Sequence, residues 1–513
     1  MAPSPAGGGP GGPLRATQTR NRGTDARNVE VLYAHGAGGL ITPSAQRNSP
    51  ILRGAAVFTG ALLLCWPAFF NRYPLLYPDS ITYLADGRAV ARALFLHKFS
   101  DYYGMRSLLY SLVIQPFHRN VSPWPVVYLQ AAVAAYVLWL VVRSLVKDAA
   151  ISRYLLLVSA LSLLTSASWY VSLVMPDVLG PLLYLCAYLL VFAPESLSGG
   201  EHGTVVAIAW WAAVSHVTHL VLAAGLCALF ALLWMAGRAP ARQFLRGTCE
   251  LALVVTVAAA SQMALGAYLF GTPSLGADTP PFLVARLIAD GPGRWYLQKH
   301  CGELDLALCE SVGKLPDNSD DFLWSPGGIW DRATREGDNR IREEEIPFAL
   351  GVLRTYPRQE LGLMASNFWE QLSTFGLWDL APNEWALENL ESALPGKKAD
   401  YLKGWQANDE LPLGFYSELQ YWVVAVSLAA IALLLPFLAG RRSLRLLGLA
   451  LIVLSTLLAN ALLAGALSNV EDRYQCRVIW LLPLAAGLSM IYWMEVRRIE
   501  RRACGSATWH DRD

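Results

Sequence analysis

Two acidic residues stand next to long apolar runs, where a membrane segment would begin or end. Asp79 lies in "YPDS", just after the first apolar run, and Tyr83 follows it. A carboxylate among aromatic side chains near a membrane surface can accept a proton from a hydroxyl group. The alternative is an N-cap, in which Asp79 or Ser80 begins the amphipathic stretch "ITYLADGRAVARALFLHKF". Spacing alone favours the cap.

The second acid and a histidine pair lie farther along the chain. Asp177 opens an apolar run in "VMPDVLG", where capping and the helix dipole are sufficient reasons for an acid, although ionisable residues at such places are often functional. His216 and His219 in "SHVTHL" share one helical face. They could ligate a metal together with a carboxylate from elsewhere, donate hydrogen bonds to a substrate, or join neighbouring helices.

Two arginines suggest a phosphate-binding site. In "SNVEDRYQCRVIWLLPL", Arg473 and Arg477 are one helical turn apart before the last apolar run. Guanidinium groups bind phosphate through paired, charge-assisted hydrogen bonds. The alternatives are contact with lipid headgroups or pairing with Glu471 or Asp472.

Composition places these residues in a polytopic membrane protein. The chain of 513 residues is 54% hydrophobic and only 16% charged. Its net charge of +1 says nothing about partners, and no basic stripe suggests nucleic-acid binding. A membrane-spanning helix needs roughly 20 apolar residues. Ten spans are predicted, at about 52–71, 123–142, 153–173, 176–193, 204–217, 219–237, 247–270, 421–439, 445–467 and 476–495.

The distribution of basic residues predicts the orientation. Loops such as "RSLVKDAAIS" and "RAPARQFLR", and the tail "VRRIERRACG", become cytoplasmic if the N-terminus is cytoplasmic and the short segment 105–117 does not cross. We therefore expect a multi-pass protein of the inner (plasma) membrane with both termini in the cytoplasm. Asp79, Asp177, the histidines and the arginines then face outward.

The chain divides into five parts by composition. Residues 1–50 are Gly/Pro-rich and are expected to be a disordered cytoplasmic N-terminus. A transmembrane module at 51–270, with a first outer loop at 72–122, precedes a mainly helical extracytoplasmic domain at 271–420, which has helical periodicity at 341–355 and 358–375. C-terminal transmembrane helices at 421–497 and a cytoplasmic tail at 498–513 complete the chain.

The outer domain contains two cysteines and an acidic run. Cys301 and Cys309 have seven residues between them, and in an oxidising compartment this favours a local disulfide over two free thiols. The acidic run "PDNSDD" lacks the glycine and distal glutamate of a calcium loop, so a solvated turn is preferred. No metal site is assigned, and the need for a divalent cation is left open.

The order of these motifs resembles the GT-C superfamily of polytopic glycosyltransferases, which use polyprenyl-phosphate-linked sugars. The resemblance rests on "YPDS" after the first span, the non-crossing "GMRSLLYSLVIQPF", "LVMPD", and the ending "DRYQCRVIWLLPL" with Arg473 and Tyr474, which is similar to an Arg-Tyr motif of such enzymes. The first loop lacks the Asp-Glu pair of the protein mannosyltransferases. The block "ADGPGRWYLQKHC" looks like part of a set of bacterial membrane proteins and implies no substrate.

The resemblance implies a GT-C-like fold and an inverting sugar transfer to a glycan, lipid or protein of the cell envelope. It implies Asp79 as the general base, and Arg473 and Arg477 as ligands of the donor phosphate, with Asp177, His216, His219, Tyr83 and Tyr474 as further substrate-binding residues. A lipid or glycan flippase would need internal repeats and ionisable groups at the span centres, and we find neither clearly in the sequence. A non-catalytic membrane scaffold is the third alternative.

Overall fold

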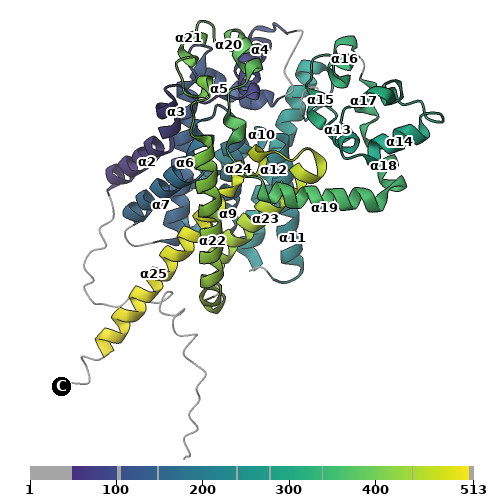
Figure 1. Cartoon of the computed structure of the whole chain (residues 1–513). Coiled ribbons are helices and arrows are strands. Elements are labelled where there is room, and N and C mark those ends of the chain that lie inside the picture. Colours follow the sequence, from purple (N-terminus) through teal and green to yellow (C-terminus); the bar gives the residue numbers. More distant parts are fainter. Residues whose placement is uncertain are drawn as a thin grey trace, which may run out of the picture. The chain divides into compact units, whose positions relative to one another are not determined.

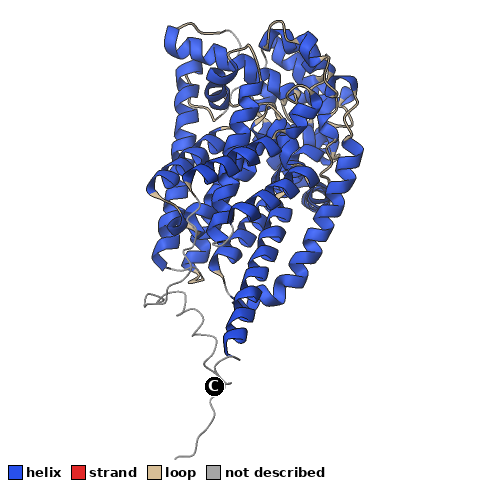
Figure 2. Cartoon of the chain, turned by 90° about the vertical axis from the view of Figure 1, so that its left-hand side faces the viewer, coloured by secondary structure: helices blue, strands red, loops and turns tan. Residues whose placement is uncertain are grey.

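The computed structural model describes residues 49–100, 106–146, 150–238, 241–275, 279–337, 339–441 and 443–507. Every regular element within these ranges is a helix, and the one β-contact is an isolated bridge between Leu75 and Leu173 (Figure 2). The predicted all-helical fold is therefore confirmed for the part described. The disorder expected for 1–50 concerns residues that lie, except for the last two, outside this part.

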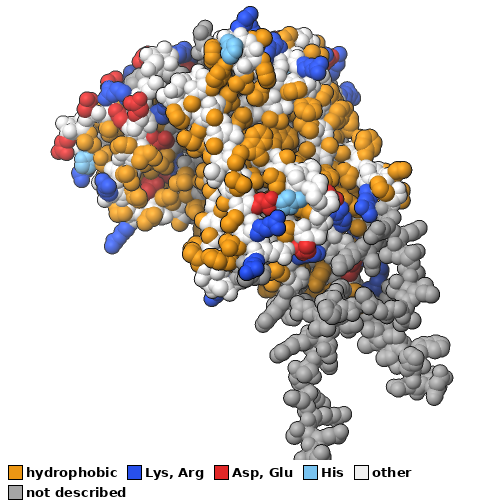
Figure 3. Space-filling view, turned by 180° about the vertical axis from the view of Figure 1, so that it is seen from behind, with side chains coloured by type: hydrophobic (Ala, Val, Ile, Leu, Met, Phe, Trp, Pro, Cys, Tyr) orange, Lys and Arg blue, Asp and Glu red, His pale blue; other side chains and the backbone are white. Residues whose placement is uncertain are grey.

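Within the described ranges, six helical stretches are long and apolar enough to cross a membrane, as expected for a polytopic membrane protein. On the face seen in Figure 3, hydrophobic side chains cover much of the helical body. The stretches are α6 (Trp124–Leu145), α11 (Val217–Met235), α12 (Ala241–Phe270), α22 (Leu413–Arg441), α23 (Leu444–Leu467) and the consecutive pair α24 (Asp472–Ile479) and α25 (Leu481–Ala507). The helix α25 continues beyond residue 498, where a tail was expected to begin.

The remaining apolar segments are interrupted helices. The first is divided at Cys65 into α2 (Pro50–Leu64) and α3 (Trp66–Asn71). The run 204–237 is divided at Ser215 and His216 into α10 (Gly199–Val214) and α11. The other interrupted segments are α7 (Ala150–Leu164) with α8 (Ala167–Ser172), and the 3₁₀ turn η1 (Pro176–Val178) with α9 (Leu179–Phe192). By length and composition alone, α11 is one of the six long helices, and the other helices named here are too short to join them.

The segment between α3 and α6 forms two helices at one end of the bundle (Figure 1). They are α4 (Pro78–Leu96) and α5 (Leu108–His118), and α5 has only 11 residues, too few to cross a bilayer. The short helices α20 (Glu384–Ala393) and α21 (Lys398–Tyr401) lie at the same end (Figure 1). The buried Asn120 side chain ties this group together, because its Nδ2 donates to the carbonyl oxygens of Leu84 and Ala393.

The long segment 271–420 is divided between two hydrophobic cores. Buried side chains between Val284 and Val352 form a core of their own. It lies among α13 (Phe282–Ala289), α14 (Pro292–His300), η3 (Ala307–Lys314), α15 (Ser319–Leu323), α16 (Ile329–Glu336), α17 (Arg340–Glu343) and α18 (Glu345–Thr355). The buried residues from Phe375 to Leu413 instead join the core of the main helical bundle. The segment 271–420 therefore consists, in packing, of one peripheral lobe and one extension of the bundle (residues 375–413).

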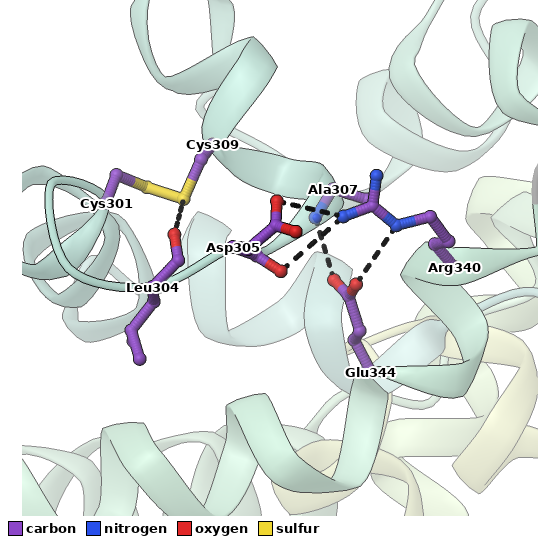
Figure 4. The surroundings of a disulfide bond; sticks show 7 residues. All are labelled: Cys301, Leu304, Asp305, Ala307, Cys309, Arg340 and Glu344. Atoms are coloured by element: carbon purple, nitrogen blue, oxygen red, sulfur yellow. Dashed lines mark hydrogen bonds and ion pairs between the residues drawn. A yellow bond between two sulfur atoms is a disulfide. The ribbon is translucent and has the colours of Figure 1, made fainter.

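The peripheral lobe is cross-linked and attached through α19 (Pro357–Ser373). A disulfide joins Cys301 to Cys309, and nearby the Arg340 guanidinium pairs with Asp305 and Glu344 (Figure 4). The helices α18 and α19 lie where periodicity at 341–355 and 358–375 predicts helices.

A buried arginine also joins the lobe to the bundle. Arg286 of α13, only 2% exposed, pairs with Asp290 and donates to the carbonyl oxygen of Gly465 in α23.

Candidate functional site

The helix α24 carries both arginines of the predicted phosphate-binding pair. Its first turn is fixed from outside, because the Asp379 carboxylate accepts the backbone N–H of Arg473 at 2.6 Å. The Asp472 carboxylate likewise accepts the N–H of Gly376. One turn apart on this short helix, the side chains of Arg473 and Arg477 point into the protein and are 9% and 4% exposed.

Asp79 lies in the first turn of α4 but does not cap it. The Ser80 hydroxyl accepts the backbone N–H of Tyr77 at 2.9 Å and so closes the start of the helix. This leaves the Asp79 carboxylate for other partners. Its Oδ1 is 2.6 Å from Nη2 of Arg106, and its Oδ2 is 3.4 Å from Nη1 of Arg473. The predicted N-cap at Asp79 or Ser80 is therefore wrong, because Tyr77 is the N-cap and Ser80 is the third residue of the helix. Asp79 instead forms a double ion pair.

Asp177 forms a second ion pair beside the first. Its Oδ1 is 3.4 Å from Nη1 of Arg477, and the two side chains are 2% and 4% exposed. The other terminal nitrogen of Arg477 is 3.4 Å from Oδ1 of Asn460 in α23. A pair buried this deeply is costly unless each charge is compensated. Since Arg473 and Arg477 share one helix, the two acid–arginine pairs lie side by side.

Aromatic rings enclose the arginines. The Arg473 guanidinium carbon is 4.2 Å from the ring centre of Tyr77 and 5.3 Å from that of Tyr474. Arg477 is 5.5 Å from the same Tyr474 ring. Tyr83 is 1% exposed, and burial, reinforced by the nearby Asp79 carboxylate, raises the pKa of its hydroxyl well above the ordinary value. Tyr83 therefore remains a protonated hydrogen-bond donor over the physiological range.

Backbone contacts explain why two acids almost a hundred residues apart meet. Leu75 N–H donates to the Ser172 carbonyl, and Val174 N–H donates to the Leu75 carbonyl, both at 3.0 Å. This bridge fixes the segment before Asp79 against the segment before Asp177. The buried Gln406 side chain also holds this segment, accepting the N–H of Leu76 and donating to its carbonyl.

The two histidines lie near the acid–arginine pairs and are held by local hydrogen bonds. His216 is the N-cap of α11, and its Nδ1 accepts the backbone N–H of Thr218. Nδ1 of His219 is 3.0 Å from the carbonyl oxygen of Ala212 and therefore carries the proton. Nε2 of His219 has no partner in the described part of the chain and faces Gly180, where an added Cβ would lie 2.8 Å away. Glycine at position 180 therefore allows α9 to approach the His219 ring of α11 closely.

The cluster also contains residues that the sequence did not single out. Arg106 is the nearest cation to Asp79, and its only signal was a basic residue at the start of a short apolar segment. Asp379, in the extension of the bundle, accepts the backbone N–H of Arg473. Asn460, in α23, contacts the Arg477 guanidinium. Conversely, Cys301 and Cys309 belong to the separate core of the peripheral lobe and not to this cluster.

The arrangement is a nearly closed, charged site rather than an open groove. Three guanidinium groups, those of Arg106, Arg473 and Arg477, face the Asp79 and Asp177 carboxylates. A cavity of about 20 Å³ adjoins Arg106 between α5 and the end of α12. Among the described residues, no group of three or more His, Cys, Asp or Glu side chains is placed to hold a metal ion. Anion binding and proton acceptance are the chemistry these groups could support.

Glu471 precedes α24 and gives a pH-dependent stability prediction. Burial, then the Asp379 and Asp320 carboxylates, raises the pKa of Glu471 from 4.5 to about 7. Between these two pH values the folded protein keeps a proton on Glu471 that the unfolded chain releases. The contribution of Glu471 to the free energy of unfolding is therefore fully present below pH 4.5 and is lost as pH rises through 7. We expect Glu471→Gln to match wild type in thermal unfolding at pH 4.5 and to be more stable at pH 8.

The control for this comparison is Glu336→Gln, at an exposed glutamate of α16. It should follow wild type across the whole pH range. A difference between wild type and Glu471→Gln that stays constant from pH 4.5 to pH 8 would contradict the assignment of the proton to Glu471.

No protein-family model, curated protein or solved structure matches this chain.

Proposed function

We propose that the protein is a GT-C-type glycosyltransferase that moves a sugar from a polyprenyl-phosphate donor to an envelope glycan, lipid or protein. The observation that carries the proposal is the Asp79 carboxylate between Arg106 and Arg473, next to the Asp177–Arg477 pair. Buried arginines clustered around a carboxylate combine an anion-binding site with a proton acceptor. The motif order of the sequence supports the same family.

In the proposed reaction the arginines bind the donor phosphate. An acceptor hydroxyl oxygen attacks the anomeric carbon, and the bond from this carbon to the phosphate oxygen breaks. The electron pair leaves on the polyprenyl phosphate, whose growing negative charge Arg473 and Arg477 stabilise. The acceptor proton moves to the Asp79 carboxylate. Attack from the face opposite the leaving group inverts the configuration of the sugar carbon.

The ion pairs impose an order on these events. Asp79 and Arg473 are each 9% exposed, and Asp177 and Arg477 are 2% and 4% exposed, so a lipid-linked sugar reaches these groups only after the surrounding helices move apart. The incoming phosphate must compete with Asp79 and Asp177 for the guanidinium groups. When the arginines bind the phosphate, Asp79 loses its ion pairs, and its carboxylate becomes available to the acceptor hydroxyl. Donor binding thus prepares the base.

The proposal includes a topology of ten crossings in the inner (plasma) membrane. The interrupted pairs α2–α3, α7–α8 and η1–α9, together with α10, are added to the six long helices. Each interruption lies where its backbone is covered by other helices, as at Ser166, whose N–H donates to Gln420. Both termini are then cytoplasmic, and the peripheral lobe and the charged cluster face outward.

The test is a transfer assay with the full-length protein in proteoliposomes. A polyprenyl-phosphate donor carrying a radiolabelled sugar is mixed with membranes from cells lacking the native gene as the acceptor source. We expect label to leave the donor and appear in a new product with free polyprenyl phosphate. Arg473→Gln should slow this about 10²- to 10³-fold, as for loss of a transition-state donor.

Arg445→Gln is the matched control, because Arg445 pairs with Glu195 away from the cluster. It should transfer sugar at the wild-type rate. Label that changes leaflet while the sugar–phosphate bond stays intact would instead indicate a flippase, and label that stays on the donor in its original leaflet with every donor tried would favour a scaffold.

A further inference from the structure

A second basic pocket lies apart from the candidate site. It has a volume of about 390 Å³ and is lined by the end of α3, the start of α6 and the region around α21. None of its lining residues belongs to the Asp79–Arg473 cluster. Whatever this pocket binds is therefore additional to the proposed donor phosphate.

The charged lining of the pocket is predominantly positive. Arg72, Lys397 and Lys403 line it together with the single acid Asp400. Both lysine ammonium groups are 3.3 Å from the Asp400 carboxylate, one at each oxygen. One carboxylate shared by two lysines, with Arg72 beside them, leaves two positive charges uncompensated within the lining. Such a pocket selects an anionic group.

Tyr73 supplies an independent sign of a ligand. Its side chain lines the pocket and is 3% exposed, yet its hydroxyl has no hydrogen-bond partner in the described part of the chain. A buried hydroxyl without a partner costs free energy. Burial raises the pKa of this hydroxyl above its ordinary value, so it remains a donor. An anion in the pocket would give it an acceptor.

The surface next to the pocket is aromatic and exposed. Trp124, which lines the pocket, stacks on Phe69 with ring centres 5.4 Å apart and lies 5.8 Å from the ring of Tyr128. Phe69 and Tyr128 are 45% and 46% exposed. Aromatic side chains of this kind mark the level of the lipid headgroups. A basic pocket directly beside them is placed to receive a headgroup whose acyl chains lie over the aromatic rings.

We propose that the pocket lined by Arg72, Tyr73, Lys397 and Lys403 binds the phosphate of an anionic membrane lipid. The two lysines and Arg72 hold the phosphate by charge, the Tyr73 hydroxyl donates a hydrogen bond to it, and Trp124 lies against the glycerol region. This site does not depend on the proposed sugar transfer.

The experiment measures lipid binding to the full-length protein in detergent by native mass spectrometry. Phosphatidylglycerol, zwitterionic phosphatidylcholine and inorganic phosphate are the probes. We expect phosphatidylglycerol to bind well above phosphatidylcholine, and Lys397→Gln/Lys403→Gln to weaken it about thirty-fold, from roughly a factor of five per lysine at a membrane surface. Tyr73→Phe, which removes only the hydroxyl, should weaken binding about tenfold.

The matched control is Lys299→Gln/Lys398→Gln, which removes the same two charges from lysines outside the pocket. It should bind phosphatidylglycerol like wild type. Equal weakening in both double variants would show general electrostatic attraction and overturn the proposal. Displacement of the lipid by inorganic phosphate at equal concentration would assign the pocket to a soluble anion and overturn the lipid assignment.

Discussion

Replacing Asp79 by Asn is expected to reduce sugar transfer by about 10²- to 10⁴-fold, the range for loss of a general base. Asparagine keeps the size of the side chain and can still accept a hydrogen bond from Arg106, which lies 2.6 Å from the native carboxylate. It cannot take the acceptor proton. The measurement is the initial rate of label transfer at saturating donor, with the Michaelis constant determined alongside. A loss in kcat with little change in KM is the expected division.

A matched variant separates loss of the base from loss of an ion pair. Asp290→Asn removes a carboxylate from the Arg286–Asp290 pair in the peripheral lobe, away from the cluster. It should leave kcat unchanged. If Asp79→Asn turned over like wild type, the assignment of the base would be wrong. If Asp177→Asn lost activity while Asp79→Asn kept it, Asp177 would be the base.

The local features of the site could be predicted from sequence because they depend on neighbours along the chain. Apolar runs give the helices, and the spacing of Arg473 and Arg477 gives their shared face on α24. The division of 204–237 into two helices follows from its excessive length, and the break falls at Ser215 and His216. Such features need only helix geometry and the thickness of a bilayer.

Partner choice could not be predicted in the same way. Asp79 and Arg473 are 394 positions apart, and Asp177 and Arg477 are 300 apart. Which acid meets which arginine depends on the bridge between Leu75 and Leu173 and on the Gln406 side chain, neither of which has a periodic signal. The role of Arg106 could not be predicted for the same reason, because it depends entirely on a partner in another helix.

The capping alternative for Asp79 shows where spacing misleads. The string "PDSITYLADG" is compatible with a cap at either Asp79 or Ser80, because both side chains can accept a backbone N–H. The helix instead begins at Pro78 with Tyr77 as its N-cap, and the Ser80 hydroxyl, in the first turn, accepts the N–H of Tyr77. Asp79 is thus the second residue of α4 rather than its cap, and its carboxylate pairs with two guanidinium groups, those of Arg106 and Arg473.

The second large effect concerns the stability of the Asp177–Arg477 pair. We expect Arg477→Met to destabilise the protein by about 3–5 kcal/mol, because it leaves a carboxylate that is 2% exposed without its counter-charge. Asp177→Leu should lower the free energy of unfolding by a similar amount, because it leaves the buried Arg477 guanidinium without its counter-charge. The double variant should recover most of the loss, since a buried ion pair can be replaced by apolar groups of similar volume at little cost. Unfolding in detergent against denaturant measures all four proteins.

The exposed pair Arg335–Asp331 in α16 provides the control cycle. Its side chains are 70% and 26% exposed, so Arg335→Met, Asp331→Leu and their combination should show a coupling of about 1 kcal/mol or less. A coupling at Asp177–Arg477 no larger than this would mean that the buried pair is not the electrostatic unit described above.

The double variant also separates the structural from the functional role of the charges. If the pair exists only to hold η1 against α24, then Asp177→Leu/Arg477→Met should be both stable and active in sugar transfer. If Arg477 binds the donor phosphate, the variant should be stable but slowed about 10²- to 10³-fold. A costly buried ion pair that apolar residues could replace without loss of stability is expected to persist where its charges act on a substrate.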